Sequence, residues 1–453
     1  MHRTLLTAIF ALTLATILPA QSLTLVDTVQ FPFVTNGLGD VGTSDCWGWT
    51  DGNGTDYAMI GNSDHIAFVR ASDGAVLDTI QLSSNGDGYY HRDMETYQHY
   101  CYVVQEMSGK REGLVVIDLQ YLPDSVHFVT SYDANQTMIR SHNLDIDSAK
   151  GFLYLESDES ISSSGVEIIN ITDPENPAKV GFVSIPAVHD IHARNDTLWA
   201  AEGSVSAFSV HDVSDKSNPQ LIGRVTSASF GYCHQIWPSD DGKFFITTEE
   251  TSNKTVKIWD ATDMNNIVMR GQYLGTNKLA HNAHVKGNYV FLSHYTSGVT
   301  VIDISDPDVP VEVASYDTYP QNDVSNFFGC WGTFPFTKNN YVYASNFAGK
   351  LFILNWDATV GLESSMPRGP GLAWPNPFQN TTNIPFELDA VTLVKAEVYD
   401  LEGRLIAQLM DKKLNAGTYV LPWQPQADIP AGTYLVKLEA GTASGTKSVQ
   451  LLR

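Results

Sequence analysis

Short apolar segments and polar turns alternate along most of the chain. Their arrangement repeats every 45 to 50 residues. Each repeat contains an apolar strand such as YVFLS and, after a turn, a second one such as VTVID. It then closes with residues rich in Asp, Ser, Asn and Pro, and no helical period lies between the turns. This pattern predicts about four antiparallel strands per repeat.

Two series of anchor residues each count seven repeats. Residues just before the first strand of each repeat form one series: Trp47, Arg92, His142, His189, His234, His281 and Trp331. Residues that close the VTVID-like strand form the other: Arg70, Asp118, Asn170, Asp212, Asp260, Asp303 and Asn355. Seven four-stranded units arranged radially make a β-propeller. The predicted fold class is therefore all-β, with a seven-bladed β-propeller over residues 22–356.

The seventh repeat lacks an obvious outer strand. The N-terminal segment LVDTVQF, residues 25–31, resembles the outer strand VLDTIQL of the first repeat. We expect the N-terminal segment to supply the missing strand and close the ring, because closure removes free strand edges.

The two ends of the chain differ from the repeats. Residues 1–20 place His2 and Arg3 before an apolar run and end on a small residue, which predicts a secretory signal peptide. No segment reaches the roughly 20 apolar residues of a membrane-spanning helix, so no transmembrane segment is expected. Residues 357–371 are predicted to be a linker, and residues 372–453 a small C-terminal β-sandwich.

Composition narrows the range of partners. A net charge of -24 repels nucleic acid and anionic membrane surfaces. The four cysteines would meet an oxidising compartment after secretion. Cys46 and Cys330 lie in matching CWG sequences on the first and last repeats, where a disulfide would lock the ring. Against that bridge, neighbouring inner strands can hold their Cα atoms beyond about 7 Å, and Cys233 occupies the same place without a matching cysteine.

One set of side chains has the chemistry of a binding or catalytic site. Four histidines precede the first strand of consecutive repeats and should form an arc beside the axis: His142, His189, His234 and His281. Four glutamates end the returning strands and should share that rim: Glu106, Glu156, Glu202 and Glu249. His294 and Asn346 continue this second series. The pairs His189/His192 and His281/His284 should point to opposite faces, because strand residues three apart do so.

The rim has two interpretations. Each histidine could bond the backbone or a glutamate of a neighbouring blade, since buried polar groups need partners. Alternatively, the imidazoles and carboxylates could hold a divalent metal or a small polar ligand, or form a metal-dependent enzyme. No nucleophile elbow, Walker loop, HExxH or CxxC motif occurs, so an enzyme would have to be built entirely from this rim.

Two family resemblances add expectations. The tail resembles the C-terminal sorting domain of the bacterial type IX secretion system through WPNPF, VYDLEGRLI, NAGTYVLPW, IPAGTYLVKLEAG and KSVQLLR. The repeats resemble LVIVD-repeat proteins, and the choice-of-anchor B group among them, through DCWGWTD, SHNLDID, VHDIHA, CHQIW and AHNAHVKGNYVFLSHYTSGVTVIDISDP. The resemblances imply a secreted or cell-surface propeller that engages the type IX machinery. Its expected role is that of a binding module for a glycan, peptide or protein.

Overall fold

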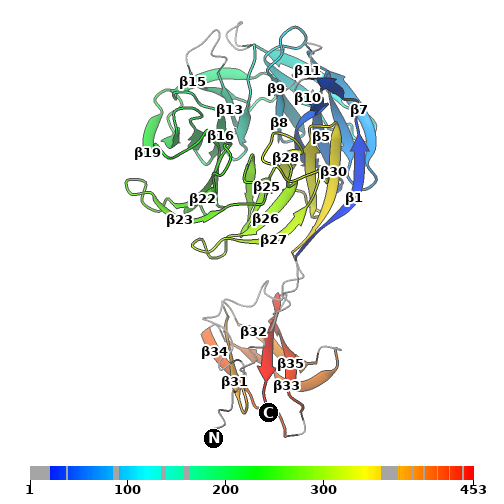
Figure 1. Cartoon of the computed structure of the whole chain (residues 1–453), viewed down its shortest axis with the longest axis vertical. Helices are drawn as coiled ribbons and strands as arrows, with labels where there is room; N and C mark the ends of the chain where they lie inside the picture. Colours follow the sequence, from blue (N-terminus) through cyan, green and yellow to red (C-terminus); the bar gives the residue numbers. More distant parts are fainter. Residues whose placement is uncertain are drawn as a thin grey trace, which may run out of the picture. The chain divides into compact units, whose positions relative to one another are not determined.

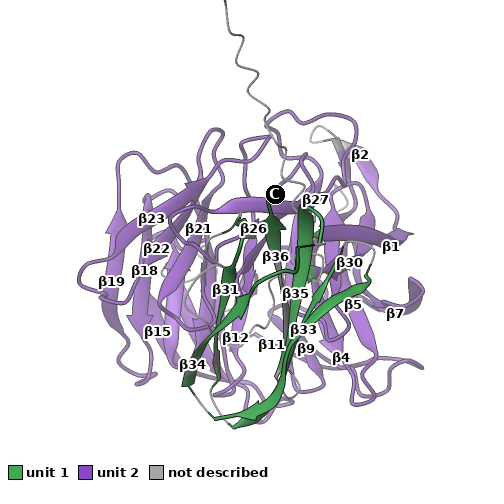
Figure 2. Ribbon diagram, turned by 90° about the horizontal axis from the view of Figure 1, so that it is seen from below, with its two compact units in different colours: residues 1–21, 358–453 green, residues 22–357 purple. Residues whose placement is uncertain are grey.

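The structure is a computed structural model with two compact units, coloured separately in Figure 2. One unit is Ser22–Asp357, and the other contains Ala358–Arg453. The predicted signal peptide, residues 1–20, and residues 359–371 of the predicted linker lie outside the described residues. The structure describes residues 21–36, 39–84, 91–133, 139–157, 164–358, 376, 378–388, 391–400, 403–415, 417–427, 429–440 and 443–453.

Seven four-stranded antiparallel sheets, the blades, make up the described part of Ser22–Asp357 (Figure 1). Blade 1 contains β4 (Thr43–Thr50), β5 (Asp56–Asn62), β6 (His65–Arg70) and β7 (Ala75–Gln81), and blade 2 contains β8 (Arg92–Tyr97), β9 (Tyr100–Gln105), β10 (Leu114–Asp118) and β11 (His127–Tyr132). Blade 3 contains β12 (Leu144–Asp147), β13 (Phe152–Glu156), β14 (Gly165–Asn170) and β15 (Ala178–Ser184), and blade 4 contains β16 (Asp190–Arg194), β17 (Thr197–Ala201), β18 (Ala207–Asp212) and β19 (Gln220–Thr226).

The remaining blades follow the same order from the inner strand outward. Blade 5 contains β20 (Cys233–Pro238), β21 (Phe244–Glu249), β22 (Val256–Asp260) and β23 (Val268–Tyr273), and blade 6 contains β24 (Ala283–Lys286), β25 (Tyr289–Ser293), β26 (Val299–Asp303) and β27 (Val311–Tyr316). Blade 7 contains β28 (Cys330–Phe334), β29 (Tyr341–Asn346), β30 (Lys350–Asp357) and β1 (Ser22–Gln30). A hairpin of β2 (Val34–Asn36) and β3 (Gly39–Val41) lies between β1 and blade 1.

The N-terminal strand closes the ring, as the sequence predicts. β1 pairs antiparallel with β30, from Ser22 opposite Asp357 to Gln30 opposite Lys350. The innermost strands contact one another in blade order, and β28 of blade 7 returns to β4 of blade 1. Together with the sheet order, this closed series confirms the predicted all-β propeller.

The blades are held together by apolar layers between the sheets. Met59 and Phe68 of blade 1 pack with Val103 and Ile117 of blade 2, and all four are fully buried. The middle strands are therefore apolar on both faces, whereas the outer strand β19 is mostly exposed. Many closing turns are set by an aspartate, such as Asp303, whose Oδ1 accepts from the Ser305 backbone N–H at 2.7 Å.

The C-terminal unit has its own core. Its four-stranded sheet has the order β33 (Leu405–Leu414), β32 (Thr392–Tyr399), β35 (Gly432–Ala440) and β36 (Ala443–Leu451), and β31 (Thr382–Leu388) pairs with β34 (Gly417–Trp423). Phe386 and Trp423 from the pair pack with Val398 and Val436 from the sheet, which is the two-layer packing of the predicted sandwich. In the part of the chain that the structure describes, no helix has the length and apolarity to cross a membrane.

Candidate functional site

Six side-chain rings from blades 2 to 7 form a closed circle around one end of the propeller axis. We call them the axial ring: His91, His142, His189, His234, His281 and Trp331. Successive ring centroids lie 5.6, 4.5, 4.3, 4.2 and 4.3 Å apart, and Trp331 returns to His91 at 4.8 Å. The four predicted histidines are therefore neighbours, and each ring packs against two others.

The axial ring differs from the sequence anchors at two positions. In blade 2 the ring member is His91, one residue before the anchor Arg92, whose side chain bonds the Asn62 and Ser83 carbonyls instead. In blade 1 the anchor Trp47 packs on Phe334, with centroids 4.7 Å apart. Histidine itself was the available signal at position 91, but a one-residue offset between repeats cannot be read from hydrophobic periodicity.

Strand alternation separates the paired histidines, as expected. His189 belongs to the axial ring, whereas His192 packs against Trp237 in a tilted arrangement, with ring centroids 4.0 Å apart. His281 likewise belongs to the ring, and His284 contacts Trp237 at 4.5 Å.

One member of the axial ring, His142, forms a charged pair with Glu106. Nδ1 of His142 is 2.5 Å from Oε1 of Glu106, and Nδ1 of His91 is 3.4 Å from its Oε2. Burial opposes charge on His142, but the hydrogen bond and charge of Glu106 outweigh it and raise the pKa of His142 to about 10. Burial likewise opposes ionisation of Glu106, and both histidines together lower its pKa below the ordinary value. The pair is therefore ionic at neutral pH.

The next three histidines are neutral. Burial and then the charges of neighbouring histidines lower the pKa of His189 and His234 well below the ordinary value. Burial lowers the pKa of His281 to about 3. His281 Nδ1 lies 2.6 Å from the Trp331 carbonyl oxygen, so this nitrogen carries the proton and donates it. Its Nε2 is then unprotonated and carries a lone pair, and this atom is buried without a hydrogen-bond partner.

Beneath the axial ring lies a small polar cavity of about 20 Å³. Its walls include Asp45, Asp93, Asn143, Asp190 and Asn282 of the inner strands, together with ring members. Asp93 Oδ2 accepts from the Leu144 backbone N–H at 2.8 Å, and Asn143 Oδ1 accepts from that of Ile191 at 3.1 Å. These side chains therefore fasten one blade to the next.

Buried acids line this cavity, and one amide oxygen in its wall lacks a hydrogen-bond partner. Burial, followed by the Asp93 charge, raises the pKa of Asp45 and of Asp190 well above the ordinary value. Burial raises the pKa of Asp93 to about 6. Asn282 is 6% exposed, and its Oδ1 has no hydrogen-bond partner. The site thus disfavours full ionisation of its acids unless a cation is present.

Three groups of side chains have the spacing that one metal ion needs. Within the described residues, the groups whose ligand atoms lie within 4.8 Å of one another are His91/Glu106/His142, His189/Asp190/His234 and His234/Glu250/His281. Glu250 was missed by the sequence analysis, which singled out its neighbour Glu249. Burial raises the pKa of Glu250 to about 7, and its carboxyl group accepts from the Tyr295 hydroxyl.

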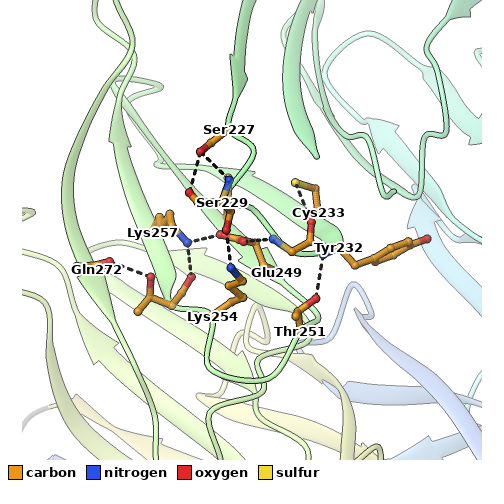
Figure 3. A network of polar contacts seen from close by, with 12 residues as sticks. Ser227, Ser229, Tyr232, Cys233, Glu249, Thr251, Lys254, Lys257 and Gln272 are labelled. Carbon is orange, nitrogen blue, oxygen red and sulfur yellow. Dashed lines mark hydrogen bonds and ion pairs between the residues drawn. The ribbon is translucent and has the colours of Figure 1, made fainter. Parts of the chain in front are cut away.

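The structure places the predicted glutamates differently from one another. Glu106 pairs with His142 of the axial ring, and the charge of Glu156 contributes to the raised pKa of His142. Glu202 instead pairs with Arg224 of its own blade, with Nε 3.0 Å from Oε1. Glu249 pairs with Lys257 and accepts from the Gly231 backbone N–H (Figure 3). Those two carboxylates serve their own blades and are not brought to the histidines.

His294 and Asn346, at the ends of the returning strands of blades 6 and 7, also take no part in the axial ring. His294 is buried beside Gly275, which has no room there for a Cβ atom. Asn346 donates from Nδ2 to the Thr318 carbonyl oxygen at 2.8 Å. Both side chains are structural, since they fill or fasten the loops above their blades.

All four cysteines are free and buried, so the structure does not contain the Cys46–Cys330 bridge. Cys46 packs in the apolar layer between blades 7 and 1, with Phe31 and Ile60. Cys330 Sγ lies 3.7 Å from the Gly332 carbonyl oxygen. The position favours a small buried side chain, which also explains the unpaired Cys233.

At the opposite ends of the inner strands lies a larger pocket, of about 360 Å³, which we call the aromatic pocket. Its aromatic walls are Trp47, Trp49, Trp237, Phe334 and Phe336, and its polar residues include Glu95, Asp145 and His192. Trp237 and Phe336 stack with an interplanar angle of 16°. The sequence does not group these residues, because blades 1, 2, 3, 4, 5 and 7 each supply only one to four of them.

Two family models match the chain. One, the LVIVD repeat, matches residues 207–227 and 279–318, in blades 4 and 6. The other, the secretion system C-terminal sorting domain, matches residues 372–451. The chain carries LVIVD repeats and a type IX sorting domain. The sorting domain indicates a secreted or cell-surface protein that engages the type IX machinery. Comparison with curated proteins finds none that matches this sequence.

Proposed function

We propose that this protein acts outside the cell as a binding module, after export through the type IX system. The aromatic pocket carries this proposal. Its volume of about 360 Å³ is within the range of small-ligand sites, and it combines apolar walls with a few convergent polar groups. The glycan, peptide or protein that it recognises would present a small group to this end of the axis. Membership of the choice-of-anchor B group remains a prediction.

A ligand panel tests the binding role. The exported protein is mixed with cell-surface polysaccharides, peptides and small metabolites, and binding is followed by tryptophan fluorescence. We expect at least one ligand whose affinity falls tenfold or more in Trp237→Leu. The matched control is Tyr121→Leu, because Tyr121 is 46% exposed and does not line the pocket. If every ligand found is unaffected by Trp237→Leu, the pocket is not the binding site.

A truncation tests the export route. Deleting residues 372–453 in a bacterium that has a type IX system should leave a folded propeller in the periplasm, because the matched sorting domain is removed. Cell fractionation and protease resistance measure location and folding. Normal delivery of the truncated chain to the surface would contradict the route.

The second candidate function is metal binding at the axial ring. The group His189/Asp190/His234 favours it, because two neutral imidazoles and one carboxylate are a common zinc ligand set. The unpartnered Nε2 of His281 and Oδ1 of Asn282 support a cation nearby. Here the metal would be held by the ring and its cavity, and Glu202 and Glu249 take no part.

Elemental analysis of the purified protein tests this candidate. We expect stoichiometric divalent metal, and its loss in the double variant His189→Ala/His234→Ala. The matched control is His65→Ala/His99→Ala, because both of these histidines lie outside the ring. Metal-free protein whose melting temperature is unchanged by zinc, manganese or calcium would leave only the blade-fastening role.

A further inference from the structure

Two buried carboxyl groups, from Glu95 and Asp145, line the aromatic pocket. Glu95 is 6% exposed and Asp145 is 2% exposed, and burial followed by the charge of Asp145 raises the pKa of Glu95 well above the ordinary value. Glu95 Oε2 accepts from the Ile146 backbone N–H at 2.9 Å. Asp145 accepts from the Ala193 backbone N–H at 2.7 Å and lies 2.9 Å from Nδ1 of His192. Two buried carboxyl groups lining one pocket favour a cation beside them, because a positive charge offsets both their burial and their mutual repulsion.

Neither lysine nor arginine is among the residues that line this pocket. Among its thirteen lining residues, the ionisable groups are Glu95, Asp145 and His192. His192 is 8% exposed, and its Nε2 has no hydrogen-bond partner. Both acids fasten blades through backbone hydrogen bonds, whereas Nε2 of His192 is a buried polar atom that no protein group satisfies.

The walls around the acids suit a positive charge. Aromatic faces attract cations through their quadrupoles, and tryptophan does so most strongly. Trp47 and Trp237 both line the pocket, and Phe334 and Phe336 complete its aromatic side. Trp49 also lines it, while its indole N–H is taken by the Gln98 carbonyl oxygen at 2.8 Å, so its ring is held in place.

We propose that the aromatic pocket binds an alkylammonium group, with the cation against the indole rings and beside the Glu95–Asp145 pair. This inference rests on the proposed binding function and names the ligand class for the same pocket. A neutral sugar would also pack on tryptophan faces, but it would leave the acid pair without a counter-charge. The acid pair therefore favours the cation.

Choline and its neutral isostere 3,3-dimethylbutan-1-ol test the proposal on the unmodified full chain. The two molecules have nearly the same shape and differ in the positive charge. By calorimetry or tryptophan fluorescence, we expect choline to bind at least tenfold more tightly than the alcohol. Equal affinities would overturn the proposal, because the pocket would then be recognising apolar shape alone.

Substitution of Glu95 locates the interaction. Glu95→Gln should weaken choline binding at least tenfold, and the matched control Glu175→Gln should leave it unchanged. Glu175 makes the same charge change but accepts from the Tyr100 hydroxyl, outside the pocket. Unchanged choline affinity in a folded Glu95→Gln variant would overturn the proposal. If this variant fails to fold, the comparison of choline with its isostere on the unmodified protein decides the question.

The binding module and its ligand class can fail separately. If methyl glucoside or a panel ligand binds in a Trp237-dependent way and choline does not, the binding function stands and the alkylammonium class is wrong. If neither choline nor any panel ligand binds, both proposals fall.

Discussion

The two ends of the propeller axis are built from the same inner strands, yet one is closed and the other is open. At the axial ring, five histidine side chains and Trp331 fill the centre and leave a cavity of about 20 Å³. Three residues further along the strands, the aromatic pocket holds about 360 Å³. Histidine and tryptophan occur at both ends, so residue type alone does not decide which end is open.

The two ends differ in whether every blade places the same kind of side chain, a flat ring, beside the axis. Blades 2 to 7 each place one flat ring at the closed end, and each ring packs on its two neighbours. At the open end, Glu95 and Asp145 of blades 2 and 3 interrupt the aromatic series. Carboxyl groups are smaller than indole rings, so a gap remains beside them. A closed circle of aromatic rings thus stabilises the fold, whereas an interrupted one leaves room for a ligand.

The largest expected contrast between the ends is in the response to losing a carboxylate. Glu106→Gln removes the partner of a charged, largely buried His142, so we expect it to lower the free energy of unfolding by about 3 kcal/mol at pH 7. Glu95→Gln should change it by less than about 1 kcal/mol. Burial and then the Asp145 charge raise the Glu95 pKa, so the neutral form is already favoured there. Urea denaturation measures both, and equal losses would show that the two ends are electrostatically alike.

The pH dependence of stability sharpens the description of the closed end. Folded protein keeps His281 neutral down to a pKa of about 3, whereas the unfolded chain takes up this proton below about pH 6.5. The unfolded state therefore binds more protons in that window, and stability falls as pH falls. At pH 5 the loss from this one group is about 2 kcal/mol.

The variant His281→Gln removes this pH-dependent contribution to the free energy of unfolding. The difference in unfolding free energy between wild type and variant should therefore shrink by about 2 kcal/mol from pH 7 to pH 5. Urea denaturation at the two pH values gives this difference directly. A difference that stays constant would mean that His281 is not held neutral by burial.

The smallest effect concerns the cysteines near the closed end. The pairing of β1 with β30 closes the propeller without a disulfide, and all four cysteines are free in the structure. We therefore expect four free thiols in denatured, unreduced protein. A reducing agent should then leave the melting temperature unchanged. Two free thiols, with Cys46 and Cys330 joined in a peptide map, would show that a covalent bond also closes this end.

Particular residues show how far the sequence carries toward the site. His142, His189, His234 and His281 were assigned to one arc because each precedes an inner strand, and the structure makes them neighbours. Position at the end of a returning strand also predicts that Glu202 and Glu249 lie beside these histidines, but those carboxylates pair with Arg224 and Lys257. Position on a strand determines the face to which a side chain points, and it does not determine which partner the side chain chooses.

The fold followed from the sequence because a propeller repeats one local pattern. The period of 45 to 50 residues, the turn chemistry and the apolar strands are all local features, and β1 could be matched to blade 7 by its resemblance to another outer strand. The tail motifs identified the sorting domain in the same way.

Only the tertiary structure decided what happens at the axis. There, side chains from up to seven blades meet. The contacts join residues about 45 to 290 positions apart, and they depend on one-residue offsets such as that of His91. The closed ring, the acid pair of Glu95 and Asp145, and the aromatic pocket are products of this convergence. Local sequence determines each strand, but the space left between strands depends on all of them at once.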